Sequence, residues 1–221
     1  MTMRTLAVMS LKGGSGKTTL SLNLAGAAQR DGGPIVLADA DPQHSLSEAL
    51  ASRAPSAPYS CVPTALSKLF QFKQECQRQG ARMLIIDTPP VLSADLSQAV
   101  NFSDLCVVVA RPTILDLNAA VKSVRMVSRL NGRVALLLNQ VPHARQGIET
   151  PLVRNAIGAL HAAGIPTSDV IIRSRAAYQY AASRGCSVLE AGGDPAAEDE
   201  MLSLWRHLQE RMQEQPALGV G

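Results

Sequence analysis

Glycine and lysine residues alternate with small polar residues in the segment 11–19, which reads Leu-Lys-Gly-Gly-Ser-Gly-Lys-Thr-Thr. An apolar run typical of a strand precedes the segment, and a stretch with helical periodicity follows it. Glycines let backbone N–H groups turn inward around a di- or triphosphate, and the start of the helix places its positive dipole end beside the same anion. We therefore expect a phosphate-binding loop, in which Lys17 reaches the β and γ phosphates and the Thr18 hydroxyl ligates Mg²⁺.

The loop differs from the common phosphate-loop pattern GxxxxGK[ST], because Leu11 occupies the position of the first glycine and Lys12 follows it. A second lysine close to a triphosphate can stabilise the charge that develops during phosphoryl transfer. The alternative for Lys12 is an exposed side chain that merely follows a strand, and the alternative for the whole loop is a glycine-rich turn without a ligand. The residues predicted to bind the nucleotide here are Lys12, Gly13, Gly14, Ser15, Gly16, Lys17, Thr18 and Thr19.

Acidic residues follow two further apolar runs. Asp39 and Asp41 alternate in the sequence Val-Leu-Ala-Asp-Ala-Asp-Pro-Gln, and Asp87 ends the run 83–87. Alternating residues of a strand point to the same side, and ligands of open α/β sheets bind at the carboxyl ends of the strands. We therefore expect the three carboxylates in the crevice that also holds the phosphate loop, although a single aspartate at a strand end is also a common cap.

Short apolar runs alternate with longer stretches of helical periodicity along the chain. This order predicts an α/β fold with a doubly wound, mostly parallel sheet and helices on both faces. The expected strands are 6–11, 35–39, 83–87, 105–110, 134–139 and 170–172, and the expected helices are 17–30, 65–79, 92–100, 115–130, 151–163, 175–183 and 197–213. Residues 52–63 contain three prolines and are expected to form a loop. Residues 1–214 are expected to form one domain, followed by a flexible tail at 215–221.

The composition excludes several classes of protein. The chain has 221 residues, of which 46% are hydrophobic and 18% are charged, so it is long enough to bury a sizeable core and is neither disordered nor collagen-like. Its apolar runs are far shorter than the ~20 residues of a membrane-spanning helix, so we expect a cytoplasmic protein without membrane attachment. The four cysteines stand at positions 61, 76, 106 and 186, and their spacing matches no metal site.

The formal net charge of +3 is unevenly distributed. Residues 111–184 carry 10 basic and 3 acidic side chains, whereas residues 185–221 carry 2 basic and 7 acidic side chains. The positive middle segment leaves a polyanion such as nucleic acid open as a partner. On the expected helix 115–130, Lys122, Arg125 and Arg129 share one face, and the alternative for this row is an ordinary solvated surface.

The segment Lys-Gly-Gly-Ser-Gly-Lys-Thr-Thr resembles the deviant Walker A motif of the ParA/MinD family of dimeric ATPases. Lys12 matches the signature lysine of that motif, which in the family reaches across a nucleotide sandwich to the phosphates bound by the partner subunit. The resemblance implies that ATP and Mg²⁺ are the cofactors and that the protein forms a homodimer when ATP binds. It also implies that Lys12, Lys17 and Asp41 are the catalytic residues. The resemblance covers most of the chain, from residue 6 to about residue 208.

The acidic segments match the same family. The segment with Asp39 and Asp41 resembles its Walker A′ segment, which implies that Asp41 positions the attacking water and Asp39 lies in the outer shell of the Mg²⁺. Leu-Ile-Ile-Asp-Thr-Pro-Pro resembles Walker B and switch II, which implies that Asp87 bonds a water of the Mg²⁺. The resemblance thus assigns Thr18, Asp39 and Asp87 to the metal. Asn139, in Leu-Leu-Leu-Asn-Gln, matches an asparagine that the family often places on the base.

Residues 110–120 and 171–190 resemble the small ATPases that partition plasmids and chromosomes. The resemblance implies that the protein binds double-stranded DNA without sequence preference, that it associates with the nucleoid, and that a ParB-like centromere-binding protein stimulates its ATP hydrolysis. Such relatives place DNA-contacting arginines after the strand that carries the base-binding residue, where this chain has Arg173, Arg175 and Arg184. About five residues precede the first expected strand, so we expect no helix-turn-helix extension for operator binding.

Several functions fit this family. The first is a DNA-segregation ATPase, and the second is an accessory ATPase of conjugative transfer or of an integrating element. A MinD-like positioning ATPase would end in a basic amphipathic helix, whereas residues 198–215 carry five acidic residues and two arginines. A ligase similar to dethiobiotin synthetase, which belongs to a different functional class, is disfavoured by Lys12 and by the positive middle segment.

Overall fold

A parallel sheet forms the centre of the computed structural model, which describes residues 2–51, 53, 58–91 and 93–214. Within these ranges the sheet has six strands in the order β3-β2-β4-β1-β5-β6. The strands are β1 (Arg4–Met9), β2 (Ile35–Asp39), β3 (Tyr59–Pro63), β4 (Met83–Asp87), β5 (Leu105–Ala110) and β6 (Val134–Leu138). All the strand pairs are parallel, so the predicted doubly wound α/β fold is confirmed.

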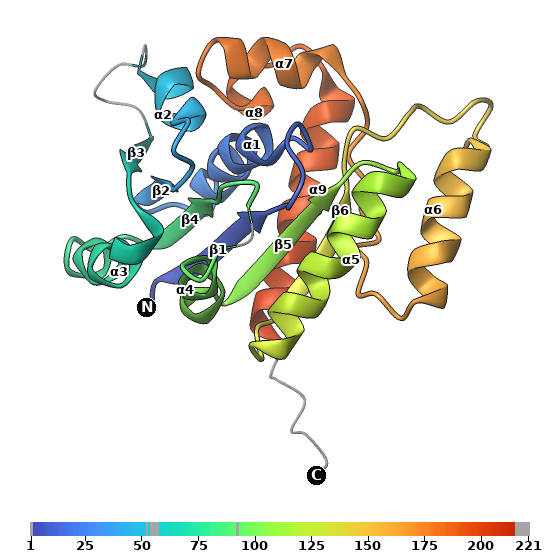
Figure 1. Cartoon of the computed structure of the whole chain (residues 1–221). Coiled ribbons are helices and arrows are strands. Elements are labelled where there is room, and N and C mark those ends of the chain that lie inside the picture. Colours follow the sequence, from blue (N-terminus) through green and yellow to red (C-terminus); the bar gives the residue numbers. More distant parts are fainter. Residues whose placement is uncertain (1, 52, 54–57, 92, 215–221) are drawn as a thin grey trace.

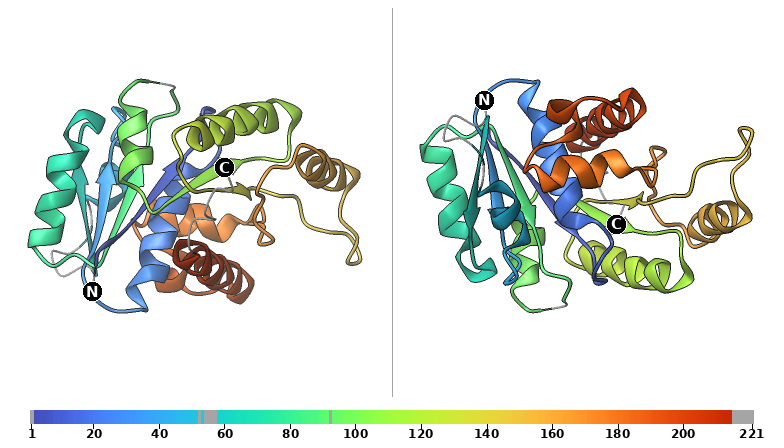
Figure 2. Two further views of the ribbon diagram at one scale, coloured as in Figure 1. Left: turned by 90° about the horizontal axis from the view of Figure 1, so that it is seen from below. Right: turned by 90° about the horizontal axis from the view of Figure 1, so that it is seen from above.

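Helices cover both faces of the sheet (Figure 1, Figure 2). One face carries α1 (Lys17–Gln29), α2 (Ser45–Leu50), α7 (Ala176–Ser183), α8 (Val188–Ala191) and α9 (Pro195–Gln213). The other face carries the short 3₁₀ helix η1 (Leu66–Lys68), α3 (Leu69–Arg78), α4 (Leu96–Phe102), α5 (Ile114–Arg129) and α6 (Pro151–Ala162). Leu6 and Val8 of β1 join the first core, and Ala7 and Met9 join the second. This alternation explains why the central strands read as continuous apolar runs.

Helix α1 begins directly after the phosphate loop and is buried along most of its length. It contacts the sheet on one side and α8 and α9 on the other, so it has no single apolar face. Gly26 allows the close approach of α8, because a Cβ at this position would lie 2.1 Å from the hydroxyl oxygen of Ser187. The side chain of Asn23 accepts a hydrogen bond of 2.8 Å from the backbone N–H of Val188, which attaches α8 to α1.

Two sequence predictions about strands are wrong. Residues 170–172 form no strand, because the side chain of Ser168 bonds the N–H of Val170 and turns the chain. Only isolated bridges remain among the described residues there, from Thr167 to Leu136 of β6 and from Arg173 to Val141, which follows β6. In the predicted loop 52–63, Tyr59–Pro63 instead forms the edge strand β3 beside β2. Proline is tolerated at an edge because its missing N–H faces no neighbouring strand.

The helix predictions are confirmed except at their boundaries and for three short elements. The sequence did not predict α2 or α8, and the expected helix 65–79 begins with the 3₁₀ turn η1. The helix expected to start at residue 92 begins at Leu96, and residue 92 itself lies outside the described residues. The predicted tail 215–221 and most of the stretch 52–57 also lie outside them. No described helix combines the length and the apolar character that crossing a membrane requires.

Candidate nucleotide-binding site

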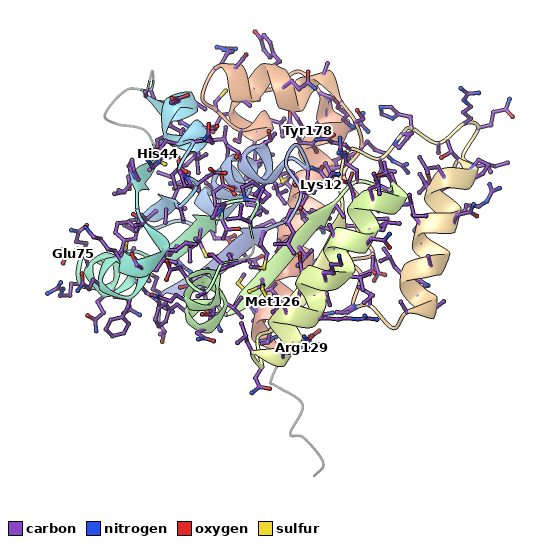
Figure 3. All side chains as sticks on the ribbon, viewed as in Figure 1. Lys12, His44, Glu75, Met126, Arg129 and Tyr178 are labelled. Carbon is purple, nitrogen blue, oxygen red and sulfur yellow. The ribbon has the colours of Figure 1, made fainter. Side chains whose placement is uncertain are left out.

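The phosphate loop joins β1 to α1 at the carboxyl edge of the sheet, where Lys12 lies (Figure 3). Gly14 and Gly16 adopt φ angles of 75° and 92°, which glycine accepts without steric cost. A Cβ on Gly16 would also lie 2.4 Å from Nδ2 of Asn139, so this position excludes a side chain for two reasons. The Ser15 hydroxyl is buried and finds no hydrogen-bond partner among the described residues. The loop therefore has the backbone shape of an anion cradle.

Lys17 lies at the start of α1 with only 7% of its surface exposed. Burial lowers the pKa of its ammonium group, while the carboxylates of Asp87 and Asp41 oppose this shift. Asp39 and Asp87 end neighbouring strands in direct register. The structure thus brings Lys17, Asp39, Asp41 and Asp87 together, as the sequence predicted.

Asp87, like Asp39, is almost completely buried. Its Oδ2 accepts a hydrogen bond of 2.8 Å from the Thr18 hydroxyl, and its Oδ1 accepts one of 3.3 Å from Ser21. Burial raises the pKa of Asp87 to about 7, although the Thr18 hydrogen bond and the charge of Lys17 act in the opposite direction. A divalent cation nearby would favour the ionised form.

Asp39 has one satisfied and one free carboxylate oxygen. Its Oδ2 accepts hydrogen bonds of 2.8 Å from both the backbone N–H and the hydroxyl of Ser47, whereas its buried Oδ1 has no partner among the described residues. No three acidic, histidine or cysteine side chains of the described chain form a metal site by themselves. Thr18, Asp39 and Asp87 therefore fit a Mg²⁺ that takes its other ligands from phosphates and water.

Asp41 differs from Asp39 because it lies on a turn and is partly exposed. Its Oδ1 accepts a hydrogen bond of 3.0 Å from the N–H of Gln43, and its carbonyl accepts one of 2.9 Å from the N–H of His44. His44 adopts a φ of 50°, which closes this turn. A carboxylate fixed on a tight turn, with solvent access, can hold a water molecule.

The end of β6 approaches the phosphate loop from the opposite side to the aspartates. Nδ2 of Asn139 donates a 2.8 Å hydrogen bond to the carbonyl of Ser15, and Nε2 of Gln140 donates one of 3.2 Å to the carbonyl of Gly14. A small pocket of about 80 Å³ opens beside them; its lining includes Thr19, Asn139, Ile172, Ser174 and Gln179. Asn139 therefore lies where a nucleotide base would extend from the phosphate loop.

The predicted DNA-contacting arginines do not share one exposed surface. Arg173 bonds both carboxylate oxygens of Glu149 at 2.9 and 2.5 Å, and Arg175 bonds Glu200 at 2.9 and 2.7 Å. Arg184, at the other end of α7, is exposed and lies over the Tyr180 ring. The structure thus surrounds the first two arginines with acidic groups.

Three residues of the site were not predicted. Ser21 follows Thr18 by one helical turn, so the helical spacing could have revealed it as a partner of Asp87. Gln140 stands next to Asn139, but no pattern indicated that its side chain would reach the phosphate loop. Ser47 bonds Asp39 only because α2 folds back onto β2, and no signal in the sequence shows this.

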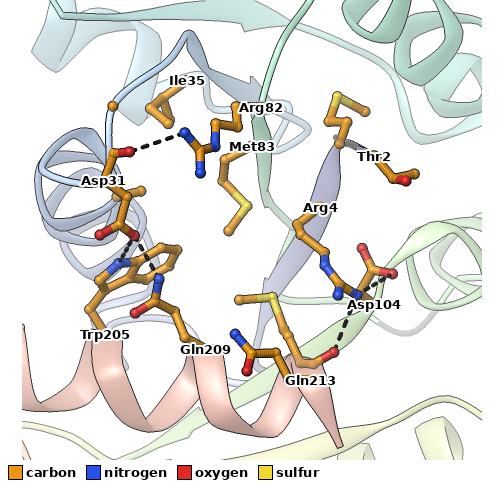
Figure 4. Close-up of a pocket in the computed structure, with 14 residues that line it drawn as sticks. Thr2, Arg4, Asp31, Ile35, Arg82, Met83, Asp104, Trp205, Gln209 and Gln213 are labelled. Carbon is orange, nitrogen blue, oxygen red and sulfur yellow. Dashed lines mark hydrogen bonds and ion pairs between the residues drawn. The ribbon is translucent and has the colours of Figure 1, made fainter. Parts of the chain in front are cut away.

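A larger cavity of about 770 Å³ lies at the opposite, amino-terminal edge of the sheet (Figure 4). There the carboxylate of Asp31 accepts hydrogen bonds from the Trp205 indole at 2.7 Å and from Gln209 at 2.6 Å, and Arg4 bonds the carbonyl of Met212 at 3.2 Å. These contacts attach α9 to the turn after α1 and to the start of β1. The cavity is far from the glycine loop and the aspartates, so we place the nucleotide at the smaller pocket.

Comparison with known proteins agrees with this geometry. Residues 6–188 match the model of the CobQ/CobB/MinD/ParA nucleotide binding domain. The chain is 32% identical over 200 residues to the maintenance of carboxysome distribution protein A of Gloeobacter kilaueensis, covering 89% of each chain. It is 31% identical over 206 residues to the protein of the same name from Halothiobacillus neapolitanus, covering 88% of this chain and 92% of the relative.

A solved structure of apo McdA from Cyanothece has a TM-score of 0.78 at 18% identity and covers 93% of this chain and 99% of its own. The McdA(D38A)–ATP complex has a TM-score of 0.71 at 17% identity, with 97% and 98% coverage. The chain belongs to the ParA/MinD family of nucleotide-binding domains, and it is an ATPase of this family. The resemblance stated from the sequence is confirmed.

Proposed function

We propose that the chain is a positioning ATPase, which distributes a cargo in the cell by alternating between an ATP-bound dimer and a nucleotide-free or ADP-bound monomer. The observation that carries the proposal is Lys12. Its side chain forms no ion pair with any described residue, although it stands beside a phosphate loop that already has Lys17. A second cation placed here serves a second nucleotide, which a partner subunit brings.

Different residues of one subunit have different roles in ATP hydrolysis. The glycine loop and Lys17 bind the phosphates, and Asn139 orients the base. Asp41 holds the attacking water on its turn, and Lys12 stabilises the charge that develops on the phosphates of the other subunit. Hydrolysis then depends on dimer formation, because each site is incomplete without the lysine of its partner.

Mg²⁺ belongs to this proposal as the cation that neutralises the phosphate charge when the nucleotide binds. The Thr18 hydroxyl is positioned to turn from Asp87 toward it. The free Oδ1 of Asp39 and the carboxylate of Asp87 can accept hydrogen bonds from its water ligands. Ser47 and Ser21 keep these two carboxylates in place.

We propose that the ATPase positions its cargo on duplex DNA, which it binds without sequence preference. Lys122, Arg125 and Arg129 form one exposed row on α5, and none of them has an acidic partner among the described residues. Arg184 adds an exposed cation on α7. Arg173 and Arg175 offer less charge to DNA, because Glu149 and Glu200 already neutralise them.

The names of the relatives, and not the nucleotide-binding site, are the guide to the kind of cargo. Two relatives are named after the maintenance of carboxysome distribution, which supports a cargo other than a plasmid for this chain. DNA partition with a ParB-like partner is the narrower candidate, and the basic row on α5 fits it as well as it fits other cargoes positioned on DNA. A partner that binds the cargo and stimulates ATP hydrolysis is common to both.

Sedimentation of the wild type and of Lys12→Ala, with Mg²⁺ and a non-hydrolysable ATP analogue or ADP, tests the proposal. We expect a dimer of the wild type only with the ATP analogue, and a monomer of Lys12→Ala in every condition. ADP binding by Lys12→Ala should stay close to that of the wild type. A Lys12→Ala dimer as stable as the wild-type dimer would contradict the role of this lysine across the dimer.

A further inference from the structure

One wall of the small pocket beside Asn139, which we call the base-pocket wall, is formed by residues 172–175 and the first turn of α7. This wall belongs to no strand. Its backbone is attached to the end of β6 and the residues that follow by a few hydrogen bonds, among them one of 3.0 Å from the N–H of Ile172 to the carbonyl of Leu138 and one of 2.9 Å from the N–H of Ser174 to the carbonyl of Val141. Beyond Ser174 the chain leaves the sheet, so other contacts must hold it.

Glu200 of α9 supplies these contacts on one side. Its Oε1 accepts two hydrogen bonds from the Arg175 guanidinium at 2.9 and 2.7 Å. Its Oε2 lies 3.0 Å from the Tyr178 hydroxyl and accepts a 3.3 Å bond from the N–H of Arg173. One carboxylate therefore connects α9 to three residues of the wall.

Glu149 supplies them on the other side. Both of its oxygens bond the Arg173 guanidinium, which also donates a 2.8 Å hydrogen bond to the carbonyl of Pro142. The side chain of Arg173 is thus held between Pro142, in the loop after β6, and Glu149, two residues before α6. Hydrogen bonding to Glu149 raises the pKa of Arg173, and hydrogen bonding to Glu200 raises that of Arg175, despite the opposing effect of burial.

We infer that Glu200 and Glu149 are positioning residues for the nucleotide base, which act through Arg175 and Arg173 to fix the wall of the base pocket. The inference rests on the proposed nucleotide site. A base is a flat, uncharged ring that is read by hydrogen bonds at its edge, so its recognition requires a wall that keeps its position.

The test separates the base from the phosphates. ADP and inorganic tripolyphosphate, both with Mg²⁺, are titrated calorimetrically into the wild type, Glu200→Ala and Glu200→Gln. We expect Glu200→Ala to weaken ADP binding about tenfold, the effect of losing charge-assisted hydrogen bonds, while tripolyphosphate binding changes less than twofold. Glu200→Gln should keep part of the ADP affinity, because its amide oxygen can still accept from Arg175.

Asp199→Asn is the matched control, because Asp199 is the exposed neighbour of Glu200 on α9 and bonds no described residue through its side chain. It should bind both ligands like the wild type. Glu149→Ala, on the other side of the wall, should also weaken ADP binding selectively. ATP preference over GTP in turnover should fall in Glu200→Ala and Glu149→Ala.

Unchanged ADP affinity in both Glu200→Ala and Glu149→Ala would overturn the inference. An equal loss of ADP and tripolyphosphate would also overturn it, because that result describes a general loss of structure. The proposed nucleotide site fails separately, if Lys17→Ala retains the ADP affinity of the wild type. The ADP affinities of the glutamate variants and of Lys17→Ala therefore distinguish failure of this inference from failure of the proposed nucleotide site.

Discussion

Two groups of cations lie in different surroundings in this protein. Arg173 and Arg175 line the base pocket, and each is bonded to a glutamate. Lys122, Arg125 and Arg129 lie on the outer face of α5, where Figure 3 shows Arg129 at the end farthest from the phosphate loop. The first group is held by the protein itself and shapes a site, whereas the second is free to meet an external anion. The neighbours of a cation, more than its place in the sequence, decide which partner it serves.

Removal of the buried cation of the nucleotide site gives the largest expected effect. Lys17→Ala should weaken ADP and ATP binding at least 100-fold, because we propose that Lys17 binds the β and γ phosphates within its own subunit. Calorimetric titration measures this. Lys68→Ala is a suitable control, since Lys68 is an exposed lysine of η1 that belongs to no part of the proposed nucleotide site. Micromolar affinity in Lys17→Ala would move the nucleotide to another site.

Asp41→Ala should slow ATP turnover about 100-fold or more while ATP binding and dimerisation remain. The water-positioning carboxylate acts in the transition state, so its loss raises the barrier without removing contacts to the bound phosphates. Steady-state turnover together with sedimentation checks this. Normal turnover in Asp41→Ala would shift the catalytic role to Asp39 or elsewhere.

Measurements of DNA affinity in variants of each cation group test which of the two groups binds DNA. Alanine at Lys122, Arg125 and Arg129 together should lower affinity for duplex DNA about tenfold or more in the ATP state. The slope of log affinity against log salt should fall by about 2–3 per subunit, because each lost phosphate contact removes about 0.9. Arg175→Ala should change the slope by less than one. A larger loss of DNA affinity and of salt slope in Arg175→Ala than in the triple variant would instead assign the DNA contact to the arginines near α7.

The smallest effect concerns a third ion pair, between Arg53 and Glu190, which connects the end of α2 to α8. Burial opposes ionisation of Glu190, but hydrogen bonds from Arg53, Ser187 and Tyr59 outweigh it and lower the pKa of Glu190. The folded protein therefore gains stability above the unfolded pKa, about 4.3, and loses it as the pH falls through the lower folded value.

The loss should amount to roughly 0.5–1 kcal/mol, because the pair is partly exposed to solvent. Denaturant unfolding between pH 6 and 3 should show a smaller acid destabilisation in Glu190→Gln than in the wild type. Equal pH profiles of the two proteins would remove this pair from the stability of the fold.

Much of the site was predictable because it is local. The glycine loop, Lys17 and the aspartates at the ends of β2 and β4 stand directly after strands whose apolar runs are visible in the sequence. Parallel strands then bring their ends together without further information. The predicted positions of Lys12, Asp39 and Asp87 around the loop followed from this rule.

The unpredicted features depend on distant contacts. Glu149 and Arg173 are 24 residues apart, and Arg175 and Glu200 are 25 apart, so no local pattern announces either pair. The resemblance to partition ATPases assigned Arg173 and Arg175 to DNA by their place after the base-binding residue, and the sequence did not reveal their acidic partners. The edge strand β3 was missed for the same reason, since its pairing with β2 outweighs the prolines around it.

Binding of fluorescent duplex DNA to the wild type, at two salt concentrations, shows whether ATP controls DNA binding. The three states to compare are nucleotide-free, Mg²⁺–ADP and Mg²⁺ with a non-hydrolysable ATP analogue. We expect tight binding with the ATP analogue alone, and a steeper salt dependence in that state because a dimer doubles the phosphate contacts. DNA affinity that is equal in all three states would contradict an ATP-driven cycle on DNA.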